Sequence, residues 1–289
     1  MRGGGTPYIP TNNTTMSEST TYNMHNNELD LHTLSGGVIL LARTTGAYLA
    51  SEQQSLQKQA IELKGTRNYV TYIDKEAERM LVEGLSLILP EAAFLTEEET
   101  VTYQQRDYTW IIDPLDGTTN YVHGDTPYSV SIALMHETKV ILGVVFDPVA
   151  DQLFVATGEG EATLNGKPLA VSRQETLVNA YIGFGIPYSL DVQGEMILAN
   201  AMKQFRNCSF RIKGSAALEI CYVAAGISDA YFHSGLSPWD VAAGAFILAC
   251  AGGRCSDFSG GNDYLFGREM VASNGSIHDA ILQTIITVK

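Results

Sequence analysis

Basic residues are scarce in this chain of 289 residues, which has 18 Lys and Arg against 32 Asp and Glu and a formal net charge of −14. Proteins that bind nucleic acid or anionic membranes need a basic surface, so this balance argues against both partners. The same balance means that an anionic substrate would need a local source of positive charge.

Long apolar runs and paired cysteines are lacking as well. No run approaches the roughly 20 residues that cross a bilayer. The N-terminus has one Arg followed by Gly, Thr and Asn, without the apolar stretch of a secretory signal. The four cysteines form no CxxC pair, which excludes the usual zinc motifs and suits a reducing cytoplasm. We therefore expect a cytoplasmic protein whose cysteines are ordinary buried residues.

A folded globular chain is indicated by 45% hydrophobic and 17% charged residues. Residues 1–28 are the exception, because they are rich in Thr, Asn, Gly and Ser and lack periodicity. They predict a flexible tail, and its opening MRGGG is typical of an expression remnant. No linker rich in Pro, Gly or Ser divides the remainder. We expect one compact domain over 29–289, with subdomains of about 29–178 and 179–289.

The first half of this domain predicts helices packed on an antiparallel sheet. Apolar residues about 3.5 positions apart over 31–48 predict one helix. A second helix begins close to Thr71–Asp74, where the sequence is similar to a capping box, and ends before Pro90.

The apolar period then changes to two, which is typical of strands. A short strand is expected over 110–112, and a hairpin over 128–134 and 140–146. Residues 161–171 predict another hairpin, in which Asn165-Gly166 forms a type I′ turn.

Short strands alternate with helices in the second half. The strands are expected over 180–184, 229–232, 254–258 and 270–272, and the helices over about 191–205, 215–225, 240–251 and 277–287. Such alternation is typical of an α/β arrangement.

Two carboxylates three positions apart, Asp113 and Asp116, follow the strand over 110–112. Pro114 fixes the backbone φ between them, and Gly117 allows a positive φ. Hard oxygen ligands at a strand end suit Mg²⁺ together with a substrate phosphate, and free N–H groups at the start of a short helix favour that phosphate. A bare Asp-x-x-Asp is nevertheless more often an ordinary turn, because Asp, Pro and Gly are common turn residues.

Other acidic residues accompany this pair. The stretch 91–116 contains seven acidic residues and one basic residue, with Glu97 directly after an apolar pair and Thr96. Downstream, Asp240 stands at an expected helix start after Trp239. A solvated acidic face and a helix N-cap would explain these features singly. Their joint occurrence favours a metal site.

The segments DPLDGTTNY at 113–121 and WDVAAG at 239–244 together resemble the paired signature of the inositol monophosphatase family, whose members are metal-dependent, lithium-sensitive phosphatases. The resemblance covers about residues 30–285, with further matches at 70–78 and 164–172. It implies a catalytic domain of the mixed α+β and α/β type, built as a sandwich of alternating α-β-α-β-α layers.

The resemblance also implies ligands for Mg²⁺. Glu97, Asp113 and the backbone carbonyl of Leu115 would hold a first ion. Asp113, Asp116 and Asp240 would hold a second ion, and Glu97 a third that is bound more loosely. Such ions neutralise phosphate oxygens, lower the pKa of a bound water and stabilise the departing alkoxide.

The remaining roles follow from the same resemblance. Thr118 with Asp74 would orient and help to deprotonate the attacking water, and Glu97 counts with them as catalytic. The amides of Gly117 and Thr118 would bind the phosphate. The residues expected against the rest of the substrate are Gly214, Ser215, Ala216, His233 and Asp240.

Two positions depart from the family pattern. Thr96 stands where a Gly usually precedes the first ligand glutamate, which is tolerable because the ligand is the following side chain. His233 stands where inositol-specific members often carry a Glu that contacts substrate hydroxyls. An imidazole offers fewer acceptor sites than a carboxylate and can carry a charge, so inositol phosphate is in doubt as the physiological substrate.

We therefore predict a Mg²⁺-dependent phosphoric monoester hydrolase, a homodimer in the cytoplasm, that cleaves inositol 1-phosphate or a related sugar or polyol phosphate by attack of water. The alternatives are phosphatases of histidinol phosphate, fructose 1,6-bisphosphate or 3′-phosphoadenosine 5′-phosphate. The ending TTNY at 118–121 favours the inositol or sugar branch. A non-catalytic regulatory member of the family is a further alternative, disfavoured because every expected metal ligand is retained.

Overall fold

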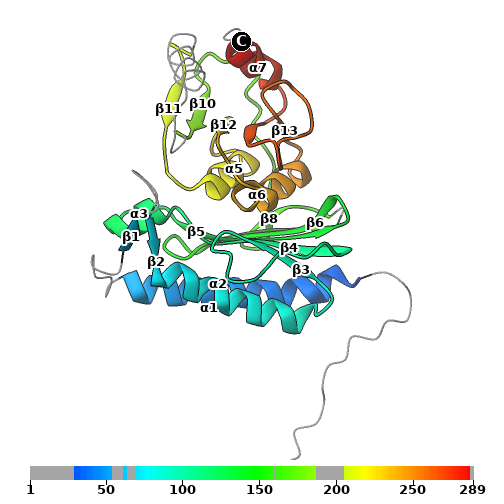
Figure 1. Cartoon of the computed structure of the whole chain (residues 1–289). Coiled ribbons are helices and arrows are strands. Elements are labelled where there is room, and N and C mark those ends of the chain that lie inside the picture. The colour runs from blue at the N-terminus through cyan, green and yellow to red at the C-terminus, as the bar shows by residue number, and fades with distance from the viewer. Residues whose placement is uncertain (1–28, 54–60, 64–68, 159, 187–204, 287–289) are drawn as a thin grey trace, which may run out of the picture. The chain divides into compact units, whose positions relative to one another are not determined.

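The computed structural model describes residues 29–53, 61–63, 69–158, 160–186 and 205–286. All the elements below belong to the unit Leu31–Lys289 (Figure 1). The tail predicted for residues 1–28 lies outside the described residues, as does nearly all of the helix predicted over 191–205.

Two long helices, α1 (Leu31–Gln53) and α2 (Tyr72–Ile88), pack against each other. Both confirm the helices expected from the apolar spacing. Val38 of α1 and Leu81 of α2 are fully buried, because the apolar stripe of each helix faces the protein interior. These helices form the first layer of the fold.

The larger sheet has seven strands in the order β3-β4-β5-β6-β7-β8-β9. The strands are β3 (Ala93–Thr96), β4 (Tyr108–Asp116), β5 (Ser129–His136), β6 (Lys139–Asp147), β7 (Gln152–Thr157), β8 (Thr163–Leu164) and β9 (Lys167–Pro168). Neighbouring strands are antiparallel except β3 and β4, which are parallel. Both predicted hairpins are confirmed, and Asn165 and Gly166 have φ of 50° and 75°, as a type I′ turn requires.

This sheet is covered on both faces. α1 and α2 lie along one face, and α5 (Ala216–Ala224) and α6 (Pro238–Cys250) lie along the other (Figure 1). The small residues that alternate with large ones in β5 are therefore buried too, and Ser131 Oγ donates to the Trp239 carbonyl of α6 over 3.2 Å. A Cβ on Gly143 would lie 2.7 Å from a backbone oxygen of α6, so glycine permits this close approach.

The second sheet has five strands in the order β11-β10-β12-β14-β13. The strands are β10 (Tyr181–Phe184), β11 (Ser209–Arg211), β12 (Ala230–Ser234), β13 (Arg254–Ser256) and β14 (Glu269–Ser273). β10 is parallel to β11 and β12, whereas β14 is antiparallel to β12 and β13. A separate antiparallel pair consists of β1 (Ile61–Leu63) and β2 (Tyr69–Thr71).

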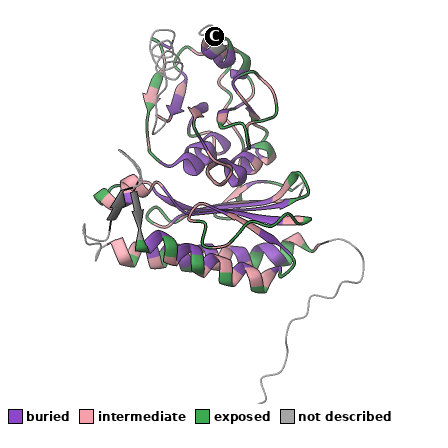
Figure 2. Cartoon of the chain, in the orientation of Figure 1, coloured by how far each residue is buried: buried purple, intermediate pink, exposed green. Residues whose placement is uncertain are grey.

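Alternate residues of the second sheet belong to two different cores. Tyr231 and Met270 pack with α5 and α6, whereas Phe232 and Val271 pack with α7 (His278–Ile286). The order of layers is thus helices, sheet, helices, sheet, helix, which confirms the expected α-β-α-β-α sandwich (Figure 1). Buried residues fill the larger sheet and the helices between the two sheets (Figure 2).

The larger sheet ends at β9 and the second begins at β10, and the subdomain boundary at about residue 178 stays a prediction. Among the described residues, no helix is both long enough and apolar enough to cross a membrane. All four cysteines are free, with Cys221 buried and the other three partly so.

Candidate active site

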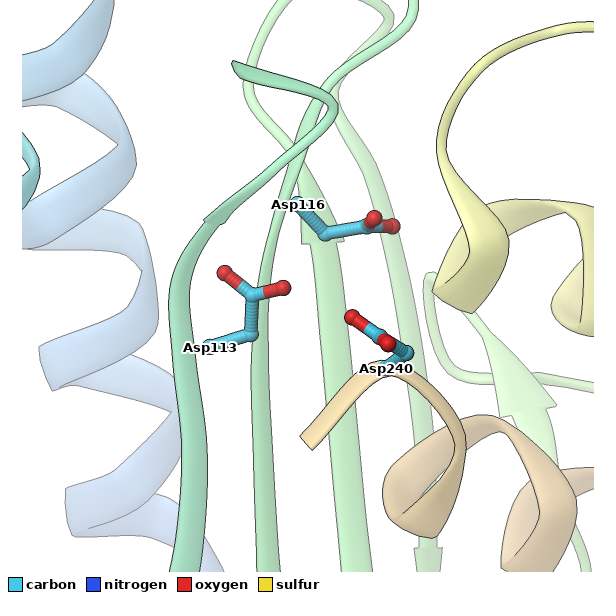
Figure 3. A group of neighbouring side chains, drawn as sticks. All are labelled: Asp113, Asp116 and Asp240. Atoms are coloured by element: carbon cyan, nitrogen blue, oxygen red, sulfur yellow. The ribbon is translucent and has the colours of Figure 1, made fainter. Parts of the chain in front are cut away.

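Three carboxylates converge where β4 ends. Asp113 and Asp116 belong to the end of β4, where its pairing with β5 is irregular, and Asp240 lies in the first turn of α6. One carboxylate oxygen of each residue lies within 4.8 Å of the other two. Figure 3 shows these side chains gathered between the strand end and the helix start. The fold therefore brings together predicted ligands from distant parts of the sequence.

The turn after β4 is fixed by its own polar groups. The Leu115 N–H donates to Asp113 Oδ1 over 2.9 Å, and Thr118 Oγ1 donates to the Leu115 carbonyl over 3.0 Å. Gly117 has the predicted positive φ, 95°, and a Cβ there would lie 3.0 Å from the Pro127 carbonyl. Only glycine fits this position, from which α3 (Thr118–His123) begins.

Asp116 connects the larger sheet to the start of α5. Ser215 Oγ donates to Asp116 Oδ2, and the N–H groups of Ala217 and Ala216 donate to the same carboxylate over 2.9 and 3.2 Å. Burial raises the pKa of Asp116 to about 6, and these hydrogen bonds limit the rise because they favour the charged form. Asp116 thus binds the free amides of a helix N-terminus.

Asp240 is held by the first turn of α6. The Ser237 N–H donates to Asp240 Oδ2 over 2.6 Å, so Ser237 is the N-cap and Asp240 the third helical residue. The alternative that Asp240 is itself the N-cap is therefore wrong. Burial, then the nearby charges of Asp116 and Glu97, raise the pKa of Asp240 well above its usual range.

Asp113 is the most central member of the cluster. It is buried, and its pKa is raised well above the usual range, first by burial and then by the charges of Glu97, Asp116 and Asp240. Asp113 and Asp116 are buried and Asp240 is half-buried, so three carboxylates repel one another in a site with little contact with solvent, and their oxygens are hard donors. This donor set fits a divalent cation such as Mg²⁺, which would offset the repulsion.

Two further predicted residues lie on or directly after elements that contact β4. Glu97 directly follows β3, whose Thr96 pairs with Ile112, and its hydrogen bond with Asp113 contributes to the raised pKa of Asp113. Asp74 is buried in the first turn of α2, the helix that packs on β4. The Leu115 carbonyl accepts from Thr118, as described above. The catalytic and ligand roles of these residues stay predictions.

The cluster opens on a cavity of about 370 Å³. This cavity is lined by seven of the residues that were predicted to bind the metal or the substrate, namely Asp116, Gly117, Gly214, Ser215, Ala216, His233 and Asp240. Thr118 is not among the lining residues, although Thr119 and Asn120 are. Asn120 Nδ2 donates to the carbonyls of Pro127 and Lys213 over 2.8 and 2.7 Å, which holds the two sides of the cavity together.

Sequence reasoning missed a group of cavity residues. They are Phe184, Gly185, Ile186, Ile212, Glu219, Tyr231, Gly235 and Leu236. Glu219 is the only charged side chain of the otherwise apolar helix α5. This isolated charge is the sequence feature that could have identified it as a cavity residue. Glu219 accepts from the Lys213 N–H over 2.8 Å, and burial raises its pKa to about 7.

His233 lines the cavity, and its contact with substrate stays a prediction. The sequence left open whether its imidazole ring is neutral or positively charged. His233 Nδ1 lies 2.9 Å from the Tyr231 hydroxyl. Burial lowers the pKa of His233 to about 4, so the ring is neutral at physiological pH. The ring therefore brings no positive charge to the cavity.

Comparison with known proteins places these features in a family. The family model described as "Inositol monophosphatase family" matches residues 30–288. Nus factor SuhB of Vibrio cholerae is 37% identical over 257 residues, which cover 88% of this chain and 96% of the relative. Inositol-1-monophosphatase of Mesorhizobium japonicum is 36% identical over 254 residues, covering 86% of this chain and 94% of the relative.

A solved structure agrees with the same assignment. The inositol monophosphatase (IMPase) of Thermotoga maritima superposes with a TM-score of 0.80 at 32% identity, covering 88% of this chain and 97% of that one. The match by the family model extends over nearly all the described residues and includes the three clustered carboxylates. The chain belongs to the inositol monophosphatase family.

Proposed function

We propose that this chain is a Mg²⁺-dependent phosphatase that hydrolyses a small phosphate monoester by direct attack of water. The observation that carries the proposal is the position of Asp116 and Asp240, which belong both to the carboxylate cluster and to the cavity wall. A cation held there would face a molecule bound in the cavity. The local sign of charge would thereby become positive, although the chain as a whole has a net charge of −14.

The residues that would hold Mg²⁺ are Glu97, Asp113, Asp116, Asp240 and the carbonyl of Leu115. When bound, the metal supplies Lewis acidity that neutralises phosphate oxygens and makes a water molecule more acidic at neutral pH. No described Ser, Cys or His motif is needed as a nucleophile under this proposal.

The chain's own groups supply positioning. Asp74 and Thr118 orient the attacking water, and Asp74 takes up its proton. The Gly117 amide, exposed by the positive φ at this residue, donates to a phosphate oxygen. In phosphoryl transfer such positioning and electrostatic stabilisation account for most of the catalysis.

The far wall of the cavity would hold the alcohol part of the substrate. Apolar side chains such as Phe184 and Leu236 alternate there with Glu219 and His233. The carboxylate and the neutral imidazole suit substrate hydroxyl groups, as in inositol 1-phosphate or another sugar or polyol phosphate. The name of the Mesorhizobium japonicum relative, inositol-1-monophosphatase, supports this substrate class.

The proposal includes three further features that follow from the sequence and the family. The enzyme acts as a homodimer, it is located in the cytoplasm, and its substrate is a small phosphate monoester rather than nucleic acid or membrane lipid. Analytical ultracentrifugation tests the homodimer, and cell fractionation tests the location.

A regulatory role is the second candidate. The observation that favours it is that a relative with 37% identity carries the name Nus factor SuhB. Retention of Asp113, Asp116 and Asp240 as a converging group disfavours a purely regulatory protein, because such a protein has no need of a metal site.

A phosphate-release screen over small monoesters separates these candidates. We expect release with Mg²⁺, loss of release with EDTA, inhibition by Li⁺, and a preference for inositol or sugar phosphates over nucleotide phosphates. The variant His233→Glu tests whether residue 233 contacts the alcohol part of the substrate. If it does, this variant should turn over inositol 1-phosphate faster than the wild type. A folded protein that releases phosphate from none of the monoesters would favour the regulatory role.

A further inference from the structure

A buried glutamate outside the carboxylate cluster holds the loop that carries Glu97. Glu78 lies on α2 and is fully buried. Its Oε1 accepts from Thr96 Oγ1 over 2.9 Å, from the Thr100 N–H over 2.8 Å and from Thr100 Oγ1 over 2.6 Å. Its Oε2 accepts from the Glu98 N–H over 2.7 Å. One carboxylate thus satisfies four donors from both sides of Glu97.

The pairing of β3 with β4 places the start of this loop, residues 96–100, beside the carboxylate cluster. β3 is parallel to β4 and pairs Thr96 with Ile112, so Glu97 leaves the strand beside Asp113. Glu78 and Asp74 are four residues apart on α2, and residues with this spacing lie on one face of a helix. The helix that carries both residues packs on β4, the strand that ends at Asp116.

We propose that Glu78 is a positioning residue that fixes the 96–100 loop so that Glu97 can complete the metal site. This inference rests on the proposed function, because Glu97 needs placing only if the cluster binds a metal. Glu78 itself touches neither the substrate nor the cluster in the contacts of the described residues. Its action passes through the backbone on either side of Glu97.

The pattern of donors requires a carboxylate. Glutamine has the same shape, but one of its two terminal atoms is an NH₂ group. If this NH₂ group took the place of Oε2, it would face the N–H donor of Glu98. If it took the place of Oε1, it would face the three donors of Thr96 and Thr100. Either orientation leaves at least one backbone N–H group of the loop facing an NH₂ group instead of an acceptor, which is unfavourable.

Thr96 adds a side-chain donor to this arrangement from the end of β3. Thr96 is buried, and its hydroxyl adds a contact between the end of β3 and Glu78. Thr96 is thus part of the contact that holds the loop to α2.

The test compares the wild-type protein with Glu78→Gln by calorimetric titration with Mg²⁺ and by hydrogen exchange of the backbone amides of 96–100. We expect the Kd for Mg²⁺ to rise about tenfold or more, as for other groups that orient metal ligands. The amides of Glu98 and Thr100 should exchange at least about tenfold faster, with or without metal. Excess Mg²⁺ should restore most of the turnover of the best monoester.

The matched control is Asp257→Asn, because Asp257 also anchors a loop. It accepts from the N–H groups of Ser259 and Gly261 over 2.8 and 2.9 Å and is not among the cavity residues. This variant should lower stability without changing the Kd for Mg²⁺. An equal change in Kd would overturn the positioning role, since it would reflect general loosening.

A milder variant covers the case in which Glu78→Gln does not fold. Thr100→Val removes one hydroxyl donor from an exposed residue and should raise the Kd for Mg²⁺ and the exchange rates about two- to threefold. A Kd and exchange rates equal to those of the wild type, in whichever variant folds, overturn the inference. Failure of the proposed function is distinct, because the wild-type protein would then bind no Mg²⁺ and release no phosphate.

Discussion

Glu219 combines two properties that oppose each other, because it is buried in an apolar helix and yet carries an ionisable group. Its pKa of about 7 lies above the ordinary value of 4.5, chiefly because burial disfavours the charged form. The unfolded chain loses this proton near pH 4.5 and the folded protein near pH 7, so Glu219 lowers stability progressively as the pH rises from about 4.5 to 7. The carboxyl group is thus held for the cavity at the expense of stability.

The variant Glu219→Gln should be more stable than the wild type at pH 8.5 and nearly equal to it at pH 5. The amide keeps an acceptor for the Lys213 N–H and removes the buried charge, and we expect a gain of about 1 to 3 kcal/mol at the higher pH. Thermal unfolding of both proteins at the two pH values measures this. A difference that does not depend on pH would contradict the assignment.

At the scale of elements, α5 begins at the site because its first turn binds Asp116. Ser215 is its N-cap and at the same time donates to Asp116 Oδ2. The free amides at the start of the helix give the carboxylate a partner that needs no basic residue. The helix between the two sheets thereby fixes one ligand of the cluster.

Ser215→Ala should lower the free energy of unfolding by about 1 to 2 kcal/mol, the usual cost of losing an N-cap. It should also raise the pKa of Asp116 further, since one hydrogen bond to the charged form is lost. Urea unfolding gives the first quantity and carbon NMR titration of the Asp116 carboxyl group the second. Ser215→Thr keeps the hydroxyl group, and a loss as large as that of Ser215→Ala would refute the capping role.

The long helices and the hairpins could be predicted because each has a local signal in the sequence, whereas the grouping of Asp113, Asp116 and Asp240 was implied by the family resemblance. β3, β7 and β11 gave no such signal, since they are short or are defined by their partners. Glu219 escaped notice because a single Glu in a helix is usually solvated, and only the fold shows that α5 is covered by two sheets. Burial by distant elements is the information that local patterns lack.

For the whole molecule, the proposed cation site predicts that stability depends on Mg²⁺. A ligand that binds only the folded state stabilises it by about 2.7 kcal/mol when its concentration is one hundred times the Kd. Mg²⁺ should therefore raise the thermal midpoint of the wild-type protein, and EDTA should reverse the change. Differential scanning calorimetry measures both.

Asp240→Asn provides the matching variant. Its amide oxygen still accepts from the Ser237 N–H, while one of three mutually repelling charges is removed. Without Mg²⁺ this variant should unfold at a higher temperature than the wild type, and Mg²⁺ should shift its midpoint little. A full Mg²⁺-induced shift in the variant would show that the cation binds elsewhere.

The most direct measurement of the central claim is phosphate release by the wild type and by Asp113→Asn over a range of Mg²⁺ concentrations. Asp113 interacts with Glu97, Asp116 and Asp240, so its loss should lower turnover at least about 100-fold while circular dichroism stays unchanged. Wild-type turnover should vanish in EDTA and return with Mg²⁺. Turnover by Asp113→Asn close to that of the wild type, or release that persists in EDTA, would contradict a catalytic metal held by these carboxylates.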